Sequence, residues 1–119
     1  MKFLENKKIL IIITGGIAAY KTLDLIRKLS KLNCEIKTIL TKNGKEFVTP
    51  LSITSLSKNK VYTDLFSIEN ESEMDHISLS RWSDIMLVAP ASSNFLTKIS
   101  NGFSDDLAST VIKASDKKV

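Results

Sequence analysis

The chain has 119 residues, a length that fits a single domain. Hydrophobic residues make up 43% and charged residues 25%, which is the mixture of a folded globular protein and argues against disorder or a collagen-like structure. The formal net charge of +4 comes from Lys and Arg that are spread along the chain without a long basic run. We therefore expect a solvated surface and no nucleic-acid partner.

The cysteine content and the longest apolar run exclude further classes. Cys34 is the only cysteine, so an intramolecular disulfide and a cysteine-based zinc site are excluded, and we expect no metal. The apolar run Ile9–Ile13 is too short to cross a bilayer, and Glu5, Lys7 and Lys8 interrupt any signal-peptide core. These features predict a soluble cytoplasmic protein without a membrane partner.

The first forty residues alternate between strand and helix patterns. Lys8–Ile13 is wholly apolar after its lysine, which predicts a central strand covered on both faces. Gly15 and Gly16 break this run, and from residue 17 to about residue 32 the apolar residues follow helical spacing. Cys34–Leu40 then predicts a second strand.

The middle of the chain contains shorter elements. Thr41–Phe47 predicts a polar turn with a short helix, and Thr49–Leu56 predicts another helix with a cap and a proline at its start. Val61–Phe66 is a weak candidate for a short strand. Ser67–Asp75 is acidic and predicts a loop, and His76–Trp82 predicts a short turn.

The last third of the chain completes the alternation. Asp84–Ala89 predicts the third clear strand, Ser92–Ser100 a short helix, and residues 104–106 cap a last helix that runs to about residue 114. Asp116–Val119 is a hydrophilic turn where a further strand is expected to begin. Strands separated by helices predict a parallel sheet with helices on both faces.

In an open parallel sheet, ligands bind beyond the carboxyl ends of the strands. Three such ends are polar or glycine-rich and lead into helices, namely Thr14–Ala19, Thr41–Gly44 and Pro90–Asn94. Helix N-termini offer unpaired N–H groups that suit a phosphate, and small residues allow close approach of a ligand to the backbone. Each end could be only a tight turn or a helix cap, but together they favour a phosphorylated cofactor.

A few other polar residues could have a chemical or a structural role. His76 is the only histidine, and it could exchange a proton or hold a carboxylate near neutral pH, although a lone histidine is more often structural. Cys34 is expected to be a small core residue. Asp105 and Asp106 are expected to complement a helix N-terminus.

Four segments stand out in order over essentially the whole chain: Gly15–Lys21, His76–Asp84, Val88–Asn94 and Asn101–Thr110. Together they resemble the flavin-dependent cysteine decarboxylases, and most closely their phosphopantothenoylcysteine decarboxylase branch in coenzyme A biosynthesis. The resemblance implies an α/β fold of the flavodoxin-like (Rossmann-like) type. We expect three layers and one FMN-binding domain over residues 1–119 that lacks the last strand and helix units.

The resemblance also implies roles for individual residues. His76 matches the active-site histidine of the family. In the family motif that corresponds to Pro90–Phe95, a threonine stands where this chain has Phe95, so a hydroxyl is lost and FMN affinity is expected to be lower. Cofactor-binding roles are implied for residues at the three strand ends: Gly15, Gly16, Ile17, Thr41, Ser92, Ser93, Asn94 and Phe95.

The implied reaction is decarboxylation of 4′-phosphopantothenoylcysteine to 4′-phosphopantetheine, in a homotrimer or a larger assembly of trimers with FMN at subunit interfaces. Oxidation of the thiol-bearing carbon to a thioaldehyde supplies the electron sink that loss of CO2 requires, with FMN as the hydride carrier. The family's Pro-Ala-Met-Asn motif and flap cysteine do not occur in this sequence. We therefore expect the isolated chain to bind FMN weakly and not to turn over substrate.

Two alternative functions remain open. The chain could be another enzyme on the same fold, such as a flavin prenyltransferase or a decarboxylase of peptide C-terminal cysteines. A prenyltransferase activity would not depend on His76. The chain could also be a non-catalytic flavin-binding module with a role in assembly or regulation.

Overall fold

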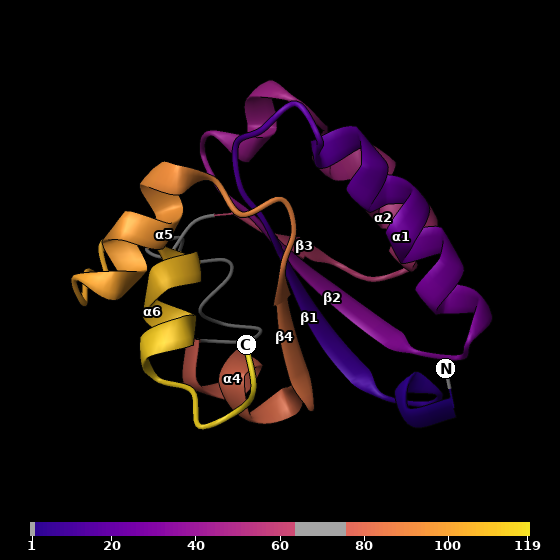
Figure 1. The fold of residues 1–119 in the computed structure, drawn as a ribbon. Helices are drawn as coiled ribbons and strands as arrows, with labels where there is room; N and C mark the ends of the chain where they lie inside the picture. Colours follow the sequence, from indigo (N-terminus) through magenta and orange to yellow (C-terminus); the bar gives the residue numbers. More distant parts are fainter. Residues whose placement is uncertain (1, 64–75) are drawn as a thin grey trace.

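A single parallel sheet forms the middle layer of the computed structural model, which describes residues 2–63 and 76–119 (Figure 1). The strands of the described part lie in the order β3-β2-β1-β4. Their bounds are β1 (Lys8–Ile13), β2 (Glu35–Leu40), β3 (Val61–Tyr62) and β4 (Ile85–Val88). Every pairing is parallel, which confirms the fold class predicted from the sequence.

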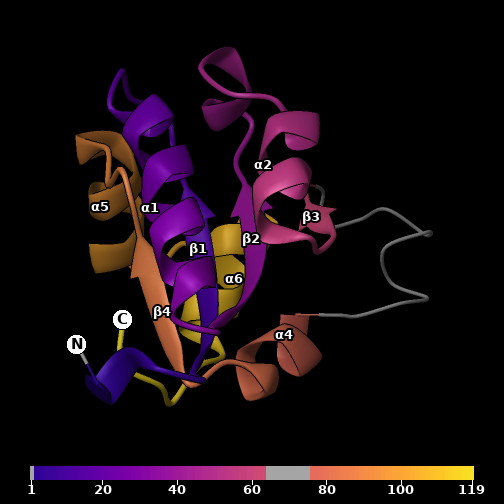
Figure 2. The same ribbon diagram turned by 90° about the vertical axis from the view of Figure 1, so that its right-hand side faces the viewer.

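The helices cover both faces of the sheet (Figures 1 and 2). One face carries α1 (Ala19–Lys31) and α2 (Pro50–Ser57). The other carries α4 (His76–Trp82), α5 (Ser93–Ser100) and α6 (Leu107–Lys113). Two short 3-10 turns, η1 (Lys2–Leu4) and η2 (Gly44–Glu46), precede β1 and follow β2.

β1 lies at the centre of the hydrophobic core. Ile9, Ile11 and Ile13 pack into the cluster under α1 and α2, whereas Leu10 and Ile12 pack into the cluster under α4, α5 and α6. These five side chains are at most 3% exposed. Because alternate residues of a strand point to opposite faces, only a strand covered on both sides can bury a continuous apolar run. Each such side chain stabilises the fold by roughly 1.5–3 kcal/mol.

Most element boundaries lie within two residues of the prediction, and one segment differs in type. Residues 76–82 form the helix α4 and not the predicted turn. Leu79 is fully buried in the core, and the Nζ atom of Lys37 lies 4.7 Å from the centre of the Trp82 ring. The three-residue spacing of Leu79 and Trp82 places both side chains on the sheet-facing side of a helix, and this packing stabilises it.

Part of the predicted 61–66 strand is present. Val61 and Tyr62 pair with Thr38 and Ile39 of β2. The rest of that segment from residue 64 onward, and the predicted loop Ser67–Asp75, lie outside the described residues.

The last residues extend the sheet beyond β4. Lys118 forms a parallel bridge with Ile85, and the N–H of Met86 donates to the carbonyl oxygen of Lys118 at 2.9 Å. This isolated bridge lies on the side of β4 that faces away from β1.

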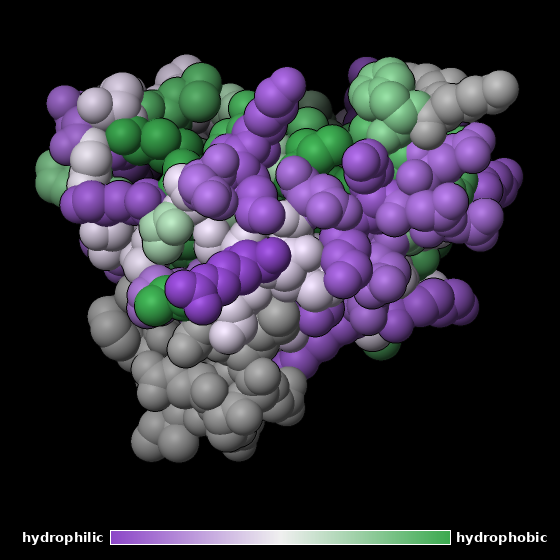
Figure 3. All heavy atoms as spheres, turned by 90° about the horizontal axis from the view of Figure 1, so that it is seen from below, coloured by the Kyte–Doolittle hydropathy of each residue, from purple (hydrophilic) through white to green (hydrophobic). Residues whose placement is uncertain are grey.

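The lowermost end of the molecule in Figure 1 is seen face-on in Figure 3, where hydrophilic side chains predominate over smaller hydrophobic areas. Among the described helices, none combines the length and hydrophobicity that a membrane-spanning segment requires.

The packing of α4 leads to a first prediction. Leu79→Ala should lower the free energy of unfolding by about 2–4 kcal/mol, because it removes fully buried methyl groups and leaves a cavity. Ile77→Ala on the same helix is a matched control, since Ile77 is 45% exposed, and it should change stability by about 0.5 kcal/mol or less. Urea unfolding measures both variants, and equal losses would contradict the placement of α4.

Candidate functional site

The ends of β1 and β4 are joined by threonine hydroxyls. Thr14 directly follows β1 and is 1% exposed. Its hydroxyl donates to the carbonyl oxygen of Pro90 and accepts the N–H of Ser92 at 3.0 Å. From α1, the hydroxyl of Thr22 donates to the carbonyl oxygen of Ala89 at 2.8 Å. Residues 89–92 after β4 are therefore held in place by side chains from β1 and α1.

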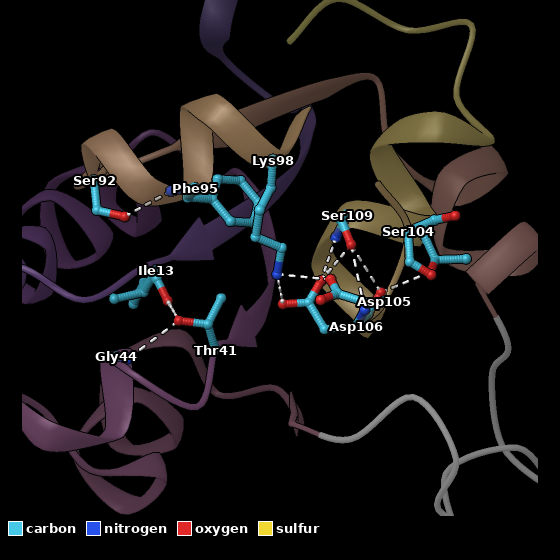
Figure 4. Close-up of polar contacts among 11 residues, drawn as sticks. Ile13, Thr41, Gly44, Ser92, Phe95, Lys98, Ser104, Asp105, Asp106 and Ser109 are labelled. Carbon is cyan, nitrogen blue, oxygen red and sulfur yellow. Dashed lines mark hydrogen bonds and ion pairs between the residues drawn. The ribbon is translucent and has the colours of Figure 1, made fainter. Parts of the chain in front are cut away.

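The end of β2 is attached to β1 in a similar way. Thr41 donates its hydroxyl to the carbonyl oxygen of Ile13 at 3.2 Å and accepts the N–H of Gly44 at 3.1 Å (Figure 4). The two loops also touch, since a Cβ atom added to Gly15 would lie 2.6 Å from the Cβ of Asn43. Glycine is required at position 15 because of this close approach.

The third strand end leads into α5 with a side-chain cap. Ser92 is the N-cap residue, and its hydroxyl accepts the N–H of Phe95 at 3.2 Å (Figure 4). Within the described part of the chain, no acceptor is assigned to the N–H groups of Ser93 and Asn94. Free N–H groups at the N-terminus of a helix, together with its dipole, favour an anionic ligand.

A cavity of about 280 Å³ lies where the three strand ends meet. A second cavity of about 420 Å³ adjoins it and shares part of its wall, including Thr41 and Lys42. The first cavity is lined by residues from all three ends and from the segment before α6: Thr14, Gly15, Thr41, Lys42, Asn43, Ser92, Asn94, Phe95, Lys98, Asp105 and Asp106.

Charged groups line the side of the cavity between α5 and α6. The Nζ atom of Lys98 lies 2.7 Å from Oδ1 of Asp105 and 3.3 Å from Oδ2 of Asp106. Burial of Lys98 disfavours its charged form, but the hydrogen bond to Asp105 and the charge of Asp106 outweigh this effect and raise the pKa of Lys98. The hydrogen bond from Lys98 lowers the pKa of Asp105. Lys98 is therefore a cation and Asp105 an anion at neutral pH.

The two aspartates differ in their structural role. Asp106 is the N-cap of α6, where its carboxylate accepts the N–H of Ser109 at 2.8 Å in a capping box. The cap expected from the sequence is thus confirmed for Asp106. Asp105 is directed to Lys98, and its side chain is 65% exposed.

Five of the residues with a predicted cofactor role line the first cavity: Gly15, Thr41, Ser92, Asn94 and Phe95. The other three lie beside it. Gly16 packs against Pro90, where an added Cβ would lie 3.3 Å from the proline ring, while Ile17 is 81% exposed and Ser93 is exposed.

His76 does not line the cavity. It is the first residue of α4 and is half-buried. α4 ends at Trp82, shortly before β4 begins at Ile85, and both ribbon views place this helix toward the end of the sheet where the strands start. The role of His76 stays a prediction.

Several cavity residues were not among the predicted cofactor ligands: Thr14, Lys42, Asn43, Lys98, Asp105 and Asp106. The sequence holds a signal for Lys98, which follows Asn94 by four residues and Phe95 by three. Residues at these spacings share one face of a helix, so Lys98 lies on the face that carries two predicted ligands.

The matched protein family provides the identification. A family model described as Flavoprotein matches residues 2–119. The chain belongs to the Flavoprotein family. This membership confirms the family expected from the sequence motifs and indicates a flavin cofactor.

Individual relatives agree with this membership. The chain of this flavoprotein is 42% identical to the coenzyme A biosynthesis bifunctional protein CoaBC of Borreliella burgdorferi, over 93% of this chain and 28% of that protein. It is 39% identical to a probable phosphopantothenoylcysteine decarboxylase of Streptococcus mutans, over 92% of this chain and 61% of the relative. The chain thus spans less than two thirds of the length of either relative.

A solved structure supports the fold. The FMN binding protein AtHal3 superimposes with a TM-score of 0.75 and 29% sequence identity, covering 94% of this chain and 61% of that one.

The hydroxyl of Thr14 leads to a second prediction. Thr14→Val keeps the shape of the side chain but leaves the partly buried Pro90 carbonyl and Ser92 N–H without their partner, which should cost about 1–3 kcal/mol of stability. Thr54→Val, at an exposed position of α2, makes the same chemical change and should have a much smaller effect. Thermal and urea unfolding compare the two variants, and equal effects would show that the Thr14 hydroxyl does not hold the site.

Proposed function

We propose that this chain binds FMN in the strand-end cavity and forms the flavin-binding part of a decarboxylase that converts 4′-phosphopantothenoylcysteine to 4′-phosphopantetheine. The observation that carries the proposal is the convergence of Gly15, Thr41 and Asn94, which come from three separate strand ends, on one cavity. The relatives named for coenzyme A biosynthesis and for this decarboxylation support the substrate.

The groups that line the cavity fit a phosphorylated ligand with hydroxyl groups. The N-terminus of α5 and the tight turn at Gly15 favour the phosphate, because they present backbone N–H groups and no bulky side chain. The carboxylate of Asp105 can accept hydrogen bonds from ribityl hydroxyls. Lys42 adds an exposed cation at the rim. Phe95 is 4% exposed and anchors α5 in the core but offers no hydroxyl, which agrees with a weaker FMN site.

The chemistry needs a group that accepts and returns a hydride, and a bound flavin supplies it. The residues of this chain would bind and orient the reactants. Thr14 and Thr41 hold the three loops at fixed positions, and Ser92 and Asn94 orient the phosphate. His76 would take up the proton that leaves the substrate thiol.

The proposal includes a homotrimer in the cytoplasm with FMN between subunits. Large hydrophobic side chains near the start of α1 and α2 support self-association, since Ile17 is 81% and Leu51 76% exposed. In such an assembly, a neighbouring copy can bring its His76 to the flavin that this chain holds, although His76 lies apart from the cavity of its own chain.

FMN binding gives the third prediction. Quenching of FMN fluorescence should saturate with the wild-type chain. Asn94→Asp places a negative charge in the cavity and should weaken FMN binding by about tenfold or more, since the phosphate carries a charge near −2. An aspartate in the first turn of α5 also favours the helix, so loss of folding cannot explain weaker binding.

A matched control for this titration is Ser52→Asp, which adds the same charge to the first turn of α2, away from the cavity lining. It should leave FMN affinity within about threefold of wild type, since a distant surface charge is screened by solvent. The absence of saturable FMN binding by the wild-type chain would contradict the proposed function.

His76 gives the fourth prediction. His76→Asn should keep FMN affinity within about threefold of wild type, because His76 does not line the cavity. In the complete decarboxylase of which this chain would be the flavin-binding part, the same variant should abolish CO2 release from 4′-phosphopantothenoylcysteine. CO2 release that is unchanged in this variant would contradict the role of His76. Binding of FMN without CO2 release in that complete protein would favour a non-catalytic flavin-binding module.

A further inference from the structure

Lys98 is the most enclosed charged group of the flavin cavity. Its side chain is 23% exposed, and its ammonium group lies between the carboxylates of Asp105 and Asp106 (Figure 4). The lysine comes from α5, whereas the two aspartates lie in the segment that precedes α6. All three residues line the cavity that we assign to FMN.

The formal charges of the cavity lining cancel. Lys42 and Lys98 carry the positive charges, and Asp105 and Asp106 carry the negative ones. Without Lys98 the lining would be net negative, and the two carboxylates would face the ligand without a close cation. A phosphate monoester carries a charge of about −1.5 to −2 at neutral pH, so it is repelled by uncompensated carboxylates.

We propose that Lys98 is a positioning residue that makes the cavity selective for a phosphorylated flavin: by neutralising Asp105 and Asp106, it allows FMN to bind more tightly than riboflavin. This inference rests on the proposed function, because it takes FMN as the ligand of the cavity.

The neighbouring groups explain why Lys98 is the residue that neutralises the two aspartates. Asp106 cannot turn away from the cavity, because its carboxylate caps α6 through Ser109. Asp105 is an anion at neutral pH, since its hydrogen bond to Lys98 lowers its pKa. Lys42 is exposed, so solvent screens its charge more strongly than that of Lys98.

The cavity has hydrogen-bond donors on one side and acceptors on the other, and the aspartates supply acceptors. The N-terminus of α5 presents N–H donors, which suit the phosphate, whereas Asp105 and Asp106 present oxygen acceptors, which suit hydroxyl groups and repel a phosphate. Lys98 lies on α5 between these two kinds of group, four residues beyond Asn94. It can therefore limit the repulsion without removing the acceptors.

The test compares FMN with riboflavin, which lacks the phosphate. Lys98→Met should weaken FMN binding roughly five- to tenfold, while riboflavin binding changes less than about twofold. The reason is that the variant removes one positive charge that faces the FMN phosphate across a solvated cavity, and riboflavin has no phosphate. Lys98→Arg keeps the charge and should retain the FMN preference. Dissociation constants come from fluorescence titration of each flavin, with circular dichroism as the check on folding.

A matched control is Lys113→Met. The Nζ atom of Lys113 donates to the carbonyl oxygen of Gly102 at 3.2 Å, so it contacts the same connection between α5 and α6, but it does not line the cavity. This variant removes the same charge from the protein and should leave both flavin affinities unchanged within about twofold.

A rescue variant separates charge from structure. Lys98→Met combined with Asp105→Asn and Asp106→Asn should regain the FMN preference, since asparagine also caps helices and the cavity loses both negative charges. An equal loss of FMN and riboflavin affinity in Lys98→Met, or no change in either, would overturn the inference. If the wild-type chain binds neither flavin, the proposed function itself fails, and this outcome is distinct from a lost preference.

Discussion

The parallel register of β1 with its two neighbours is the constraint on which the site depends. Ile13 lies opposite Leu40 of β2, and Ile12 lies opposite Val88 of β4, so the three strands end at nearly the same level. Three chain segments that are distant in sequence therefore leave the sheet side by side. The hydrogen bonds that Thr14 and Thr41 make across the strand ends support this register.

Two threonine hydroxyls turn this common edge into a defined site. Thr14 and Thr41 are both buried, and each satisfies backbone groups of a neighbouring segment: Pro90 and Ser92 for Thr14, and Ile13 for Thr41. Backbone groups at the ends of strands need partners when they are shielded from water. Side chains of the protein supply them here, which leaves the N–H groups at the start of α5 for a ligand.

The structural features that depend on a local sequence pattern can be predicted from the sequence. The family resemblance implies the ligand roles of the five predicted cavity residues. From the apolar run of β1 and the polar strand ends, the sequence itself predicts the sheet and the edge at which the cavity lies, because period and turn chemistry are local properties. It does not predict α4 as a helix, since that helix depends on the burial of Leu79 against the rest of the fold. The pairing of Lys98 with Asp105 and Asp106 cannot be predicted from local spacing, because the two aspartates lie in the segment before the next helix. The position of His76 likewise depends on tertiary packing.

The central claim is that the three strand ends form one flavin site. The most direct test is a titration of the ¹⁵N-labelled chain with FMN, followed by amide chemical shifts. We expect saturable shifts at Gly15, Thr41 and Asn94 with one common dissociation constant, and no comparable shifts at α2, whose residues do not line the cavity. Shifts confined to one strand end, or centred on another surface, would contradict it.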